Sequence, residues 1–158
     1  MAVAGLSTIG ATFSYGVEPT AGTKPTTFTE LSRINQIGGI SIDTEQIDAS
    51  ALKDAITRYI AGRGDTGGTF NVTVNLTDDT EKEWDDLIKA YKALTGGKAM
   101  WFQTTIKGLA KAFFVVAQPP DKIPQSEVGQ NELATVEMPL VIEDYKGLDT
   151  KVEPTPGE

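Results

Sequence analysis

Two overlapping motifs in residues 62–68, GRGDTGG, have spacings that could do chemistry. Gly62, Gly64 and Gly67 match the G-x-G-x-x-G pattern of a dinucleotide-binding loop, and residues 63–65 spell the adhesion tripeptide Arg-Gly-Asp. A dinucleotide loop needs a helix directly after its glycines, because the helix N-terminus holds the pyrophosphate. The next residues, TFNVTVNL, alternate apolar and polar side chains as a strand does. The pattern therefore predicts a turn that feeds a strand, and the tripeptide is short enough to arise by chance.

The carboxylates suggest two further kinds of site, and neither is supported by its surroundings. The acidic cluster from Asp78 to Asp86 could hold a divalent cation, but it lacks the central glycine of a calcium loop and becomes helical at once. The preference of negative charge for a helix N-terminus explains this cluster. Paired carboxylates such as Asp43 and Glu45 could serve a glycosidase, yet no neighbouring residue indicates a raised pKa or a sugar platform.

The composition removes most catalytic machinery. The 158-residue chain has no cysteine and no histidine, which excludes disulfides, thiolate ligands and the commonest general base. We therefore expect no enzyme and no metal or cofactor site. The formal net charge of −8 disfavours ordinary binding to nucleic acid, since an acidic surface repels phosphate. This charge indicates either simple solubility or a surface past which nucleic acid moves without sticking.

The hydropathy pattern predicts a mainly β protein with one helix. The predicted strands are 11–17, 28–31, 38–48, 68–76, 99–106, 111–118 and 132–144. The period changes in residues 77–97, where Trp84, Leu87, Ile88, Tyr91 and Leu94 form one helical stripe.

The ends of this helix carry capping signals. Thr80 with Glu83 fits a capping box, Asp78 is a rival N-cap, and Gly96 or Gly97 supplies the stop. We expect the helix over about residues 78–95.

We expect one domain over residues 1–150, which begins with an arm or long loop at 1–27. Pro139 in the last strand favours an edge, a bulge or the start of a new pairing, and the tail 151–158 is expected to be flexible. Helix and strands do not alternate, which favours an antiparallel β-sandwich or barrel with one flanking α-helix.

The chain has no apolar run of membrane-spanning length and no signal-peptide pattern at its start, which favours a cytoplasmic protein.

Several segments occur in an order that matches a known family over about residues 5–145. They are ATFSYG, then FTELSRINQIGGISIDTEQIDAS, LKDAITRYIAGRGDTG and GTFNVTVNLT, then the acidic-started helix and the strand pair AMWFQTTI and AKAFFVVAQPP. In this combination the chain resembles the major tail tube protein of long-tailed, siphovirus-type bacteriophages. The tubes of type VI secretion and related contractile systems look similar in fold.

The resemblance implies a structural virion protein of the phage tail, assembled in the bacterial host cytoplasm. Six copies would form a ring, and rings would stack into the hollow tube through which DNA is ejected, without specific binding. The implied partners are its own copies, a tape measure protein in the lumen, and tail tip or initiator and terminator proteins. A tube protein of a contractile or type VI-like system, or a monomeric virion decoration or host-binding module, is the alternative.

Two sets of residues are expected on the surfaces of such a tube. The polar faces of two predicted strands are expected to line the lumen: Ser41, Asp43, Glu45, Asn71, Thr73 and Asn75. Strand 111–118 is apolar on both faces, so Phe113 and Val115 are expected to contact the helix or a neighbouring subunit. Arg63 and Asp65 are candidates for salt bridges between subunits, in a connector that becomes ordered when a neighbour packs against it.

Overall fold

The protein, seen in a computed structural model, is described over residues 4–156. Its strands are β1 Thr12–Val17, β2 Thr29–Leu31, β3 Ile34–Ile37, β4 Asp43–Asp48, β5 Tyr59–Asp65, β6 Thr69–Asn75, β7 Met100–Thr105, β8 Lys111–Gln118, β9 Thr135–Thr150 and β10 Thr155–Pro156. The helix α1 spans Asp78–Lys92. The first three residues of the predicted arm and the last two of the predicted tail lie outside the described residues.

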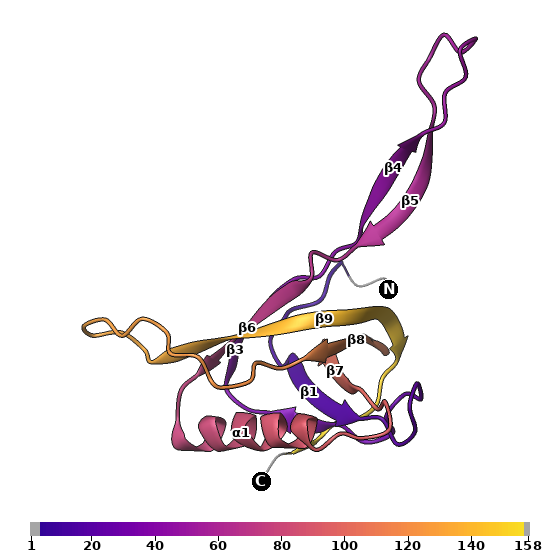
Figure 1. Cartoon of the computed structure of the whole chain (residues 1–158). Coiled ribbons are helices and arrows are strands. Elements are labelled where there is room, and N and C mark those ends of the chain that lie inside the picture. Colours follow the sequence, from indigo (N-terminus) through magenta and orange to yellow (C-terminus); the bar gives the residue numbers. More distant parts are fainter. Residues whose placement is uncertain (1–3, 157–158) are drawn as a thin grey trace.

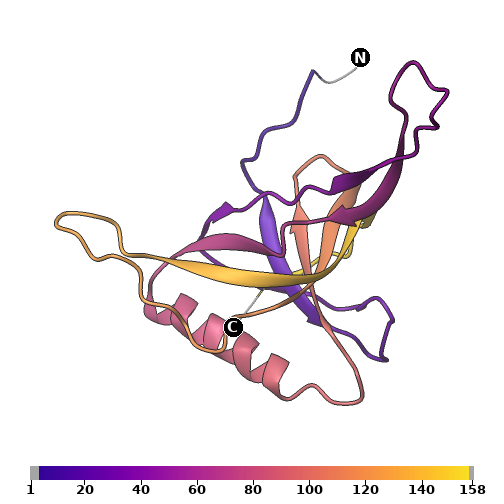
Figure 2. The same ribbon diagram turned by 45° about the horizontal axis from the view of Figure 1, so that its top comes forward.

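Eight strands form one curled sheet, and β4 and β5 form a separate two-stranded hairpin (Figure 1). The sheet order is β10-β2-β1-β7-β8-β9-β6-β3, with every pairing antiparallel except that of β10 with β2. The sheet curls until β3 approaches β1, and α1 lies along its open side (Figure 2). The predicted fold, mainly β with one flanking helix in a sandwich or barrel, is confirmed.

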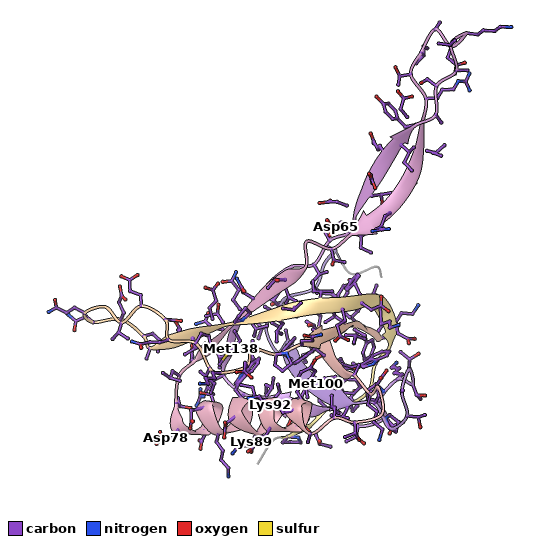
Figure 3. The ribbon with its side chains drawn as sticks, viewed as in Figure 1. Asp65, Asp78, Lys89, Lys92, Met100 and Met138 are labelled. Atoms are coloured by element: carbon purple, nitrogen blue, oxygen red, sulfur yellow. The ribbon has the colours of Figure 1, made fainter. Side chains whose placement is uncertain are left out.

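The main core lies between the concave face of the sheet and α1. The alternation predicted for β6 is real, because Phe70, Val72 and Val74 are buried. Met100 and Met138 also lie inside this body (Figure 3). The helical stripe contributes Trp84, Leu87 and Ile88, and the rings of Phe13 and Phe102 stack with centroids 5.4 Å apart. Burial of this continuous apolar layer is the main stabilising contribution to the fold.

The helix begins at Asp78, as predicted, but its capping residues and its C-terminal end differ from the prediction. Thr77 is the N-cap, and Thr77 and Thr80 form the capping box with one another. Glu83 has a different partner, because its carboxylate accepts hydrogen bonds from the amide and hydroxyl of Ser32 at 2.9–3.0 Å. The C-cap is Ala93, so the helix stops before residue 95.

Strand β9 is the longest element and connects the two halves of the sheet. Residues 135–141 pair with β6, and residues 141–150 pair with β8 through two register shifts. Such bulges bend a strand and increase its twist, which helps the sheet to curl. Pro139 lies two residues before the pairing with β8 begins at Val141 and stands opposite Asn71, whose carbonyl oxygen accepts a hydrogen bond from the Gly38 amide at 2.7 Å. Of the three predicted alternatives, an edge, a bulge or the start of a new pairing, this position agrees with the last, because β9 is an internal strand whose pairing with β8 begins at Val141.

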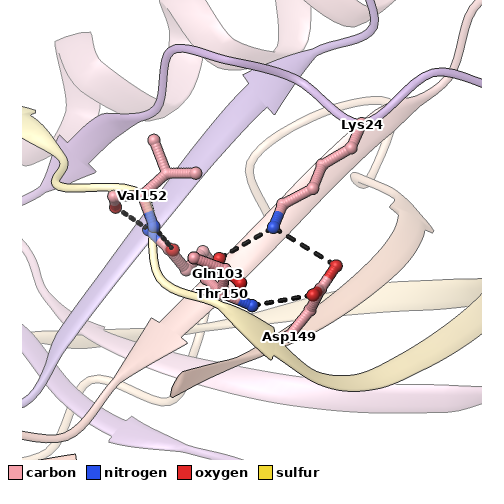
Figure 4. Close-up of polar contacts among 5 residues, drawn as sticks. All are labelled: Lys24, Gln103, Asp149, Thr150 and Val152. Carbon is pink, nitrogen blue, oxygen red and sulfur yellow. Dashed lines mark hydrogen bonds and ion pairs between the residues drawn. The ribbon is translucent and has the colours of Figure 1, made fainter. Parts of the chain in front are cut away.

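The tail that was expected to be flexible is held along residues 151–156. The Gln103 side chain bonds both backbone groups of Val152 at 2.8 and 2.9 Å (Figure 4). Lys24 reaches the Asp149 carboxylate at 3.3 Å and the Thr150 carbonyl oxygen at 2.7 Å. β10 then pairs with β2. Val152 also packs against the second core, so the tail is held by one apolar contact and by the buried Gln103.

A buried carboxylate fixes the turn after β1. Glu18 is 4% exposed and accepts hydrogen bonds from the Trp101 indole N–H at 2.9 Å and the Ala99 amide at 2.8 Å. The Gly22 amide donates a third, at 3.2 Å. Burial alone would raise the pKa of Glu18, but these donors outweigh it and hold the pKa below its ordinary value.

We predict a specific acid sensitivity for this site. The folded protein binds the Glu18 proton less readily than the unfolded chain, so the contribution is complete above about pH 4.3 and falls as the pH drops through the lowered pKa. Glu18→Gln should lower the free energy of unfolding by about 1–3 kcal/mol at pH 7, with a smaller difference near pH 3. Urea titrations at both pH values measure this. Glu137→Gln, on an exposed residue of β9, is the control, and an equal loss at both pH values would contradict the prediction.

Candidate assembly interface

The hairpin β4–β5 extends away from the body of the protein (Figures 1 and 2). β4 pairs with β5 from Asp43 opposite Asp65 to Asp48 opposite Tyr59, and every residue of β4 is exposed. The motif GRGDTGG therefore lies differently from the prediction. Its first four residues belong to β5, and the turn is confined to residues 66–68, where Gly67 and Gly68 have positive φ.

The glycines of β5 make room for side chains of the neighbouring strand. A Cβ added to Gly64 would lie 2.7 Å from the Ile42 Cγ2 atom, and one added to Gly62 would lie 3.1 Å from the Ile47 Cδ1 atom. The G-x-G spacing thus allows two isoleucines to lie across the hairpin. This packing accounts for Gly62 and Gly64, and no helix follows them that could hold a phosphate.

The hairpin carries apolar side chains that nothing in the monomer covers. Six of the exposed large apolar residues belong to it: Ile42, Ile47, Leu52, Ile56, Tyr59 and Ile60. Leu52 and Ile56 lie in the connecting loop, and Ile56 is 80% exposed. A two-stranded hairpin is marginally stable alone, and clustered apolar exposure marks an interaction surface.

The six residues expected to line a lumen fall into two groups. Asp43 and Glu45 lie on β4, and Ser41 lies just before it. The other three belong to the outer face of the main sheet: Asn71, Thr73 and Asn75 lie on β6. Since β4 and β6 belong to different sheets, one subunit does not combine these residues into one strand pair.

The residues expected between subunits also divide into two groups. Arg63 and Asp65 are exposed on β5, and neither forms an ion pair within residues 4–156. Asp65, labelled at the base of the hairpin in Figure 3, accepts a hydrogen bond from the Gly67 amide at 2.9 Å.

Strand β8 is buried on both faces within the subunit. Val115 is 5% exposed and packs in the main core, so it is not available to a neighbour, while Phe113 is half-buried. The opposite face forms a second core with Phe28 and Trp101. The apolar side chains on both faces of β8 are thus explained by burial in two cores of the same subunit.

The acidic residues that could have held a metal ion do not form such a site in the described part of the chain. Within residues 4–156, no three carboxylates gather as ligands for a metal ion. The acidic start of α1 is solvated, and Asp85 pairs with Lys89 one turn later at 2.9 Å. No helix in this part of the chain is long and apolar enough to cross a membrane.

Comparisons with known proteins relate the fold to tail-like particles. No protein-family model matches the chain, and no curated protein matches its sequence. A structure of the anti-feeding prophage baseplate, 6-fold symmetrised, is similar with a TM-score of 0.57 and 10% identity, covering 92% of this chain and 96% of that one. The PVC sheath/tube terminator of an extracellular contractile injection system, in its extended state, is similar with a TM-score of 0.55 and 13% identity, covering 87% and 93%. The chain therefore shares its fold with chains of these two structures.

Proposed function

We propose that this chain is the repeating subunit of a tail tube. Six copies form a ring, and the rings stack into a hollow conduit through which DNA passes into the host. The observation that carries this proposal is the protruding hairpin, whose isoleucines and open strand edges have no cover within the subunit. Neighbouring copies would bury those side chains and continue those edges, which removes an aggregation hazard.

The similar structures support a role in an assembly of several subunits. One is a baseplate described as 6-fold symmetrised, and the other is a sheath/tube terminator. Both come from tail-like particles, which supports a virion location and partners within the tail. We extend the proposal to a tape measure protein in the lumen, a tail tip or initiator, and a terminator.

A contractile tail is the second candidate setting. The PVC structure belongs to a contractile injection system, so a tube inside a sheath is favoured by a specific observation. A monomeric decoration or host-binding module has less support. It predicts an exposed aromatic patch, and Tyr59 is the only aromatic among the exposed large apolar residues of the described chain.

The proposal places acidic side chains of the hairpin base in the lumen. Asp43 and Asp65 are cross-strand partners, and Glu45 is exposed on the same hairpin. Like charges opposite one another are unfavourable in a strand pair, so Asp43 and Asp65 do not stabilise the hairpin through this pairing. A carboxylate-lined wall would repel DNA phosphates and limit sticking during ejection.

We predict that the double variant Asp43→Lys/Glu45→Lys assembles normally but retains DNA. Each tube subunit then gains four units of positive charge, and binding to phosphates becomes favourable and dependent on salt. Cosedimentation of tubes with short duplex DNA at low salt measures this. The control is Lys82→Glu/Asp79→Lys, which exchanges charges on the exposed face of α1 without a net change. Loss of rings in the double variant would contradict a lumen position for Asp43 and Glu45 and would place these two carboxylates in a subunit contact.

Native mass spectrometry of the concentrated protein tests the ring directly. The proposal predicts a species of six chains, alone or after addition of a tail initiator. A monomer at every concentration, with and without initiator, contradicts it.

A further inference from the structure

A groove lies under the loop that leads into β9, on a different side of the body from the hairpin. It has a volume of about 340 Å³. One wall comes from Leu76 and the first turn of α1, and the other comes from residues 123–136. Three of its apolar lining residues are exposed: Leu76, Val128 and Leu133, at 44%, 83% and 65%. The groove is thus apolar and uncovered in the subunit.

The rim of this groove is acidic. Glu81, Glu127 and Glu132 line it, and its lining contains no lysine or arginine. None of these carboxylates forms an ion pair within the described residues. An occupant that brings apolar side chains and a positive charge would satisfy both properties of the groove.

The hairpin tip, residues 49–58, has this chemistry. Leu52 is fully exposed and Ile56 nearly so. Between them is Lys53, which has no ion-pair partner within residues 4–156, whereas Arg58 already pairs with Asp54 at 3.5 Å. The tip thus presents an unpaired positive charge, although the chain as a whole has a formal net charge of −8.

The tip and the groove are also placed so that copies can join head to tail. In both views of the ribbon, the hairpin and the loop before β9 extend from opposite sides of the body (Figures 1 and 2). A contact between two different surfaces propagates from copy to copy and builds rings or filaments. The tip cannot reach the groove of its own chain in this arrangement.

We propose that the hairpin tip of one subunit docks into the groove under residues 123–136 of the next subunit. Leu52 and Ile56 enter the apolar groove, and Lys53 faces the Glu127 carboxylate at its rim. This inference rests on the proposed function and identifies the partner surface for the hairpin. The other candidate receptor is a groove of about 600 Å³ at the base of the hairpin, but its lining has no charged residue to match Lys53.

Cysteine pairs test the contact, because the chain has no cysteine of its own. Ala51→Cys is mixed with Gln125→Cys, each carrying a tag of different mass, and the assembled material is oxidised. Ala51 is next to Leu52 in the tip, and Gln125 lines the acidic groove. The proposal predicts a mixed disulfide dimer in denaturing electrophoresis. The competing pair is Ala51→Cys with Thr8→Cys, since Thr8 lines the larger groove.

The outcomes separate this inference from the proposed function. Tubes that crosslink position 51 to 125 support both. Tubes that crosslink 51 to 8, or that crosslink neither pair, overturn the docking inference and leave the tube function intact. Absence of any ring or tube from the unsubstituted protein with initiator overturns the tube function, and the docking inference fails with it.

A charge exchange gives a second, independent test. Lys53→Glu and Glu127→Lys should each raise the critical concentration for assembly by about tenfold, and the double variant should restore it to within about threefold of the original. Lys82→Glu, on the exposed face of α1, changes net charge equally and should have little effect. A double variant as impaired as either single variant would overturn the pairing of Lys53 with Glu127.

Discussion

Replacing Leu52 and Ile56 with serine should abolish assembly and leave the subunit folded. Both side chains are exposed at the hairpin tip and contribute nothing to either core. If a neighbouring copy buries them, their loss removes about 3 kcal/mol or more per contact, which raises the critical concentration by about a hundredfold or more. Sedimentation velocity across a concentration series, with thermal melts of the same samples, measures both effects.

The matched control for this variant is Ala55→Ser. It adds a hydroxyl to the same loop and keeps both large apolar side chains, so assembly should continue. The account is contradicted if the Leu52→Ser/Ile56→Ser protein still polymerises at the concentration of the unsubstituted chain. A large fall in melting temperature would also contradict it, because the tip would then support the fold of the subunit.

Phe102→Ala should have the largest effect on folding, with a loss of about 3–5 kcal/mol in the free energy of unfolding. Phe102 is 0% exposed, stacks on Phe13 and lies on β7 in the middle of the curled sheet. Its removal leaves a cavity between the sheet and α1. Equilibrium unfolding in urea measures the loss.

Tyr59→Ala, in the hairpin, is the contrasting variant. Tyr59 is 59% exposed and belongs to neither core, so the change should stay within about 0.5 kcal/mol for the unassembled subunit. Similar losses for Phe102→Ala and Tyr59→Ala would contradict the division of the protein into a self-sufficient body and a hairpin stabilised by its neighbours.

The sequence was most informative where one chain completes its own packing. The alternation of Phe70, Val72 and Val74 predicted a half-buried strand, and the stripe of Trp84, Leu87 and Ile88 predicted the helix. In both cases the side chains are buried by the same subunit, so local pattern and tertiary structure agree.

The hairpin could not be predicted from pattern alone. Residues 62–65 are rich in glycine and look like a turn, but strand β5 forms because it pairs with β4 and because its glycines accommodate Ile42 and Ile47. Residues 38–48 were predicted as one strand, but β4 begins only at Asp43, and all of its residues are exposed in the subunit. The sequence indicates that these apolar side chains should be buried. It does not show whether the same chain or a neighbouring copy buries them.

Other differences arise from contacts between residues distant in the sequence. Val115 was expected at a subunit contact, but it packs in the main core between the sheet and α1, while Phe28 and Trp101 cover the opposite face of β8. The tail was expected to be flexible, and it is held by Gln103, a polar residue 49 positions away. Polar anchors of this kind have no period that reveals them.

Electron microscopy of the negatively stained, concentrated protein, with and without a tail initiator, tests the central claim most directly. The account predicts hollow tubes whose end views have sixfold symmetry. A field of single particles, with no rings or tubes under either condition, would contradict it.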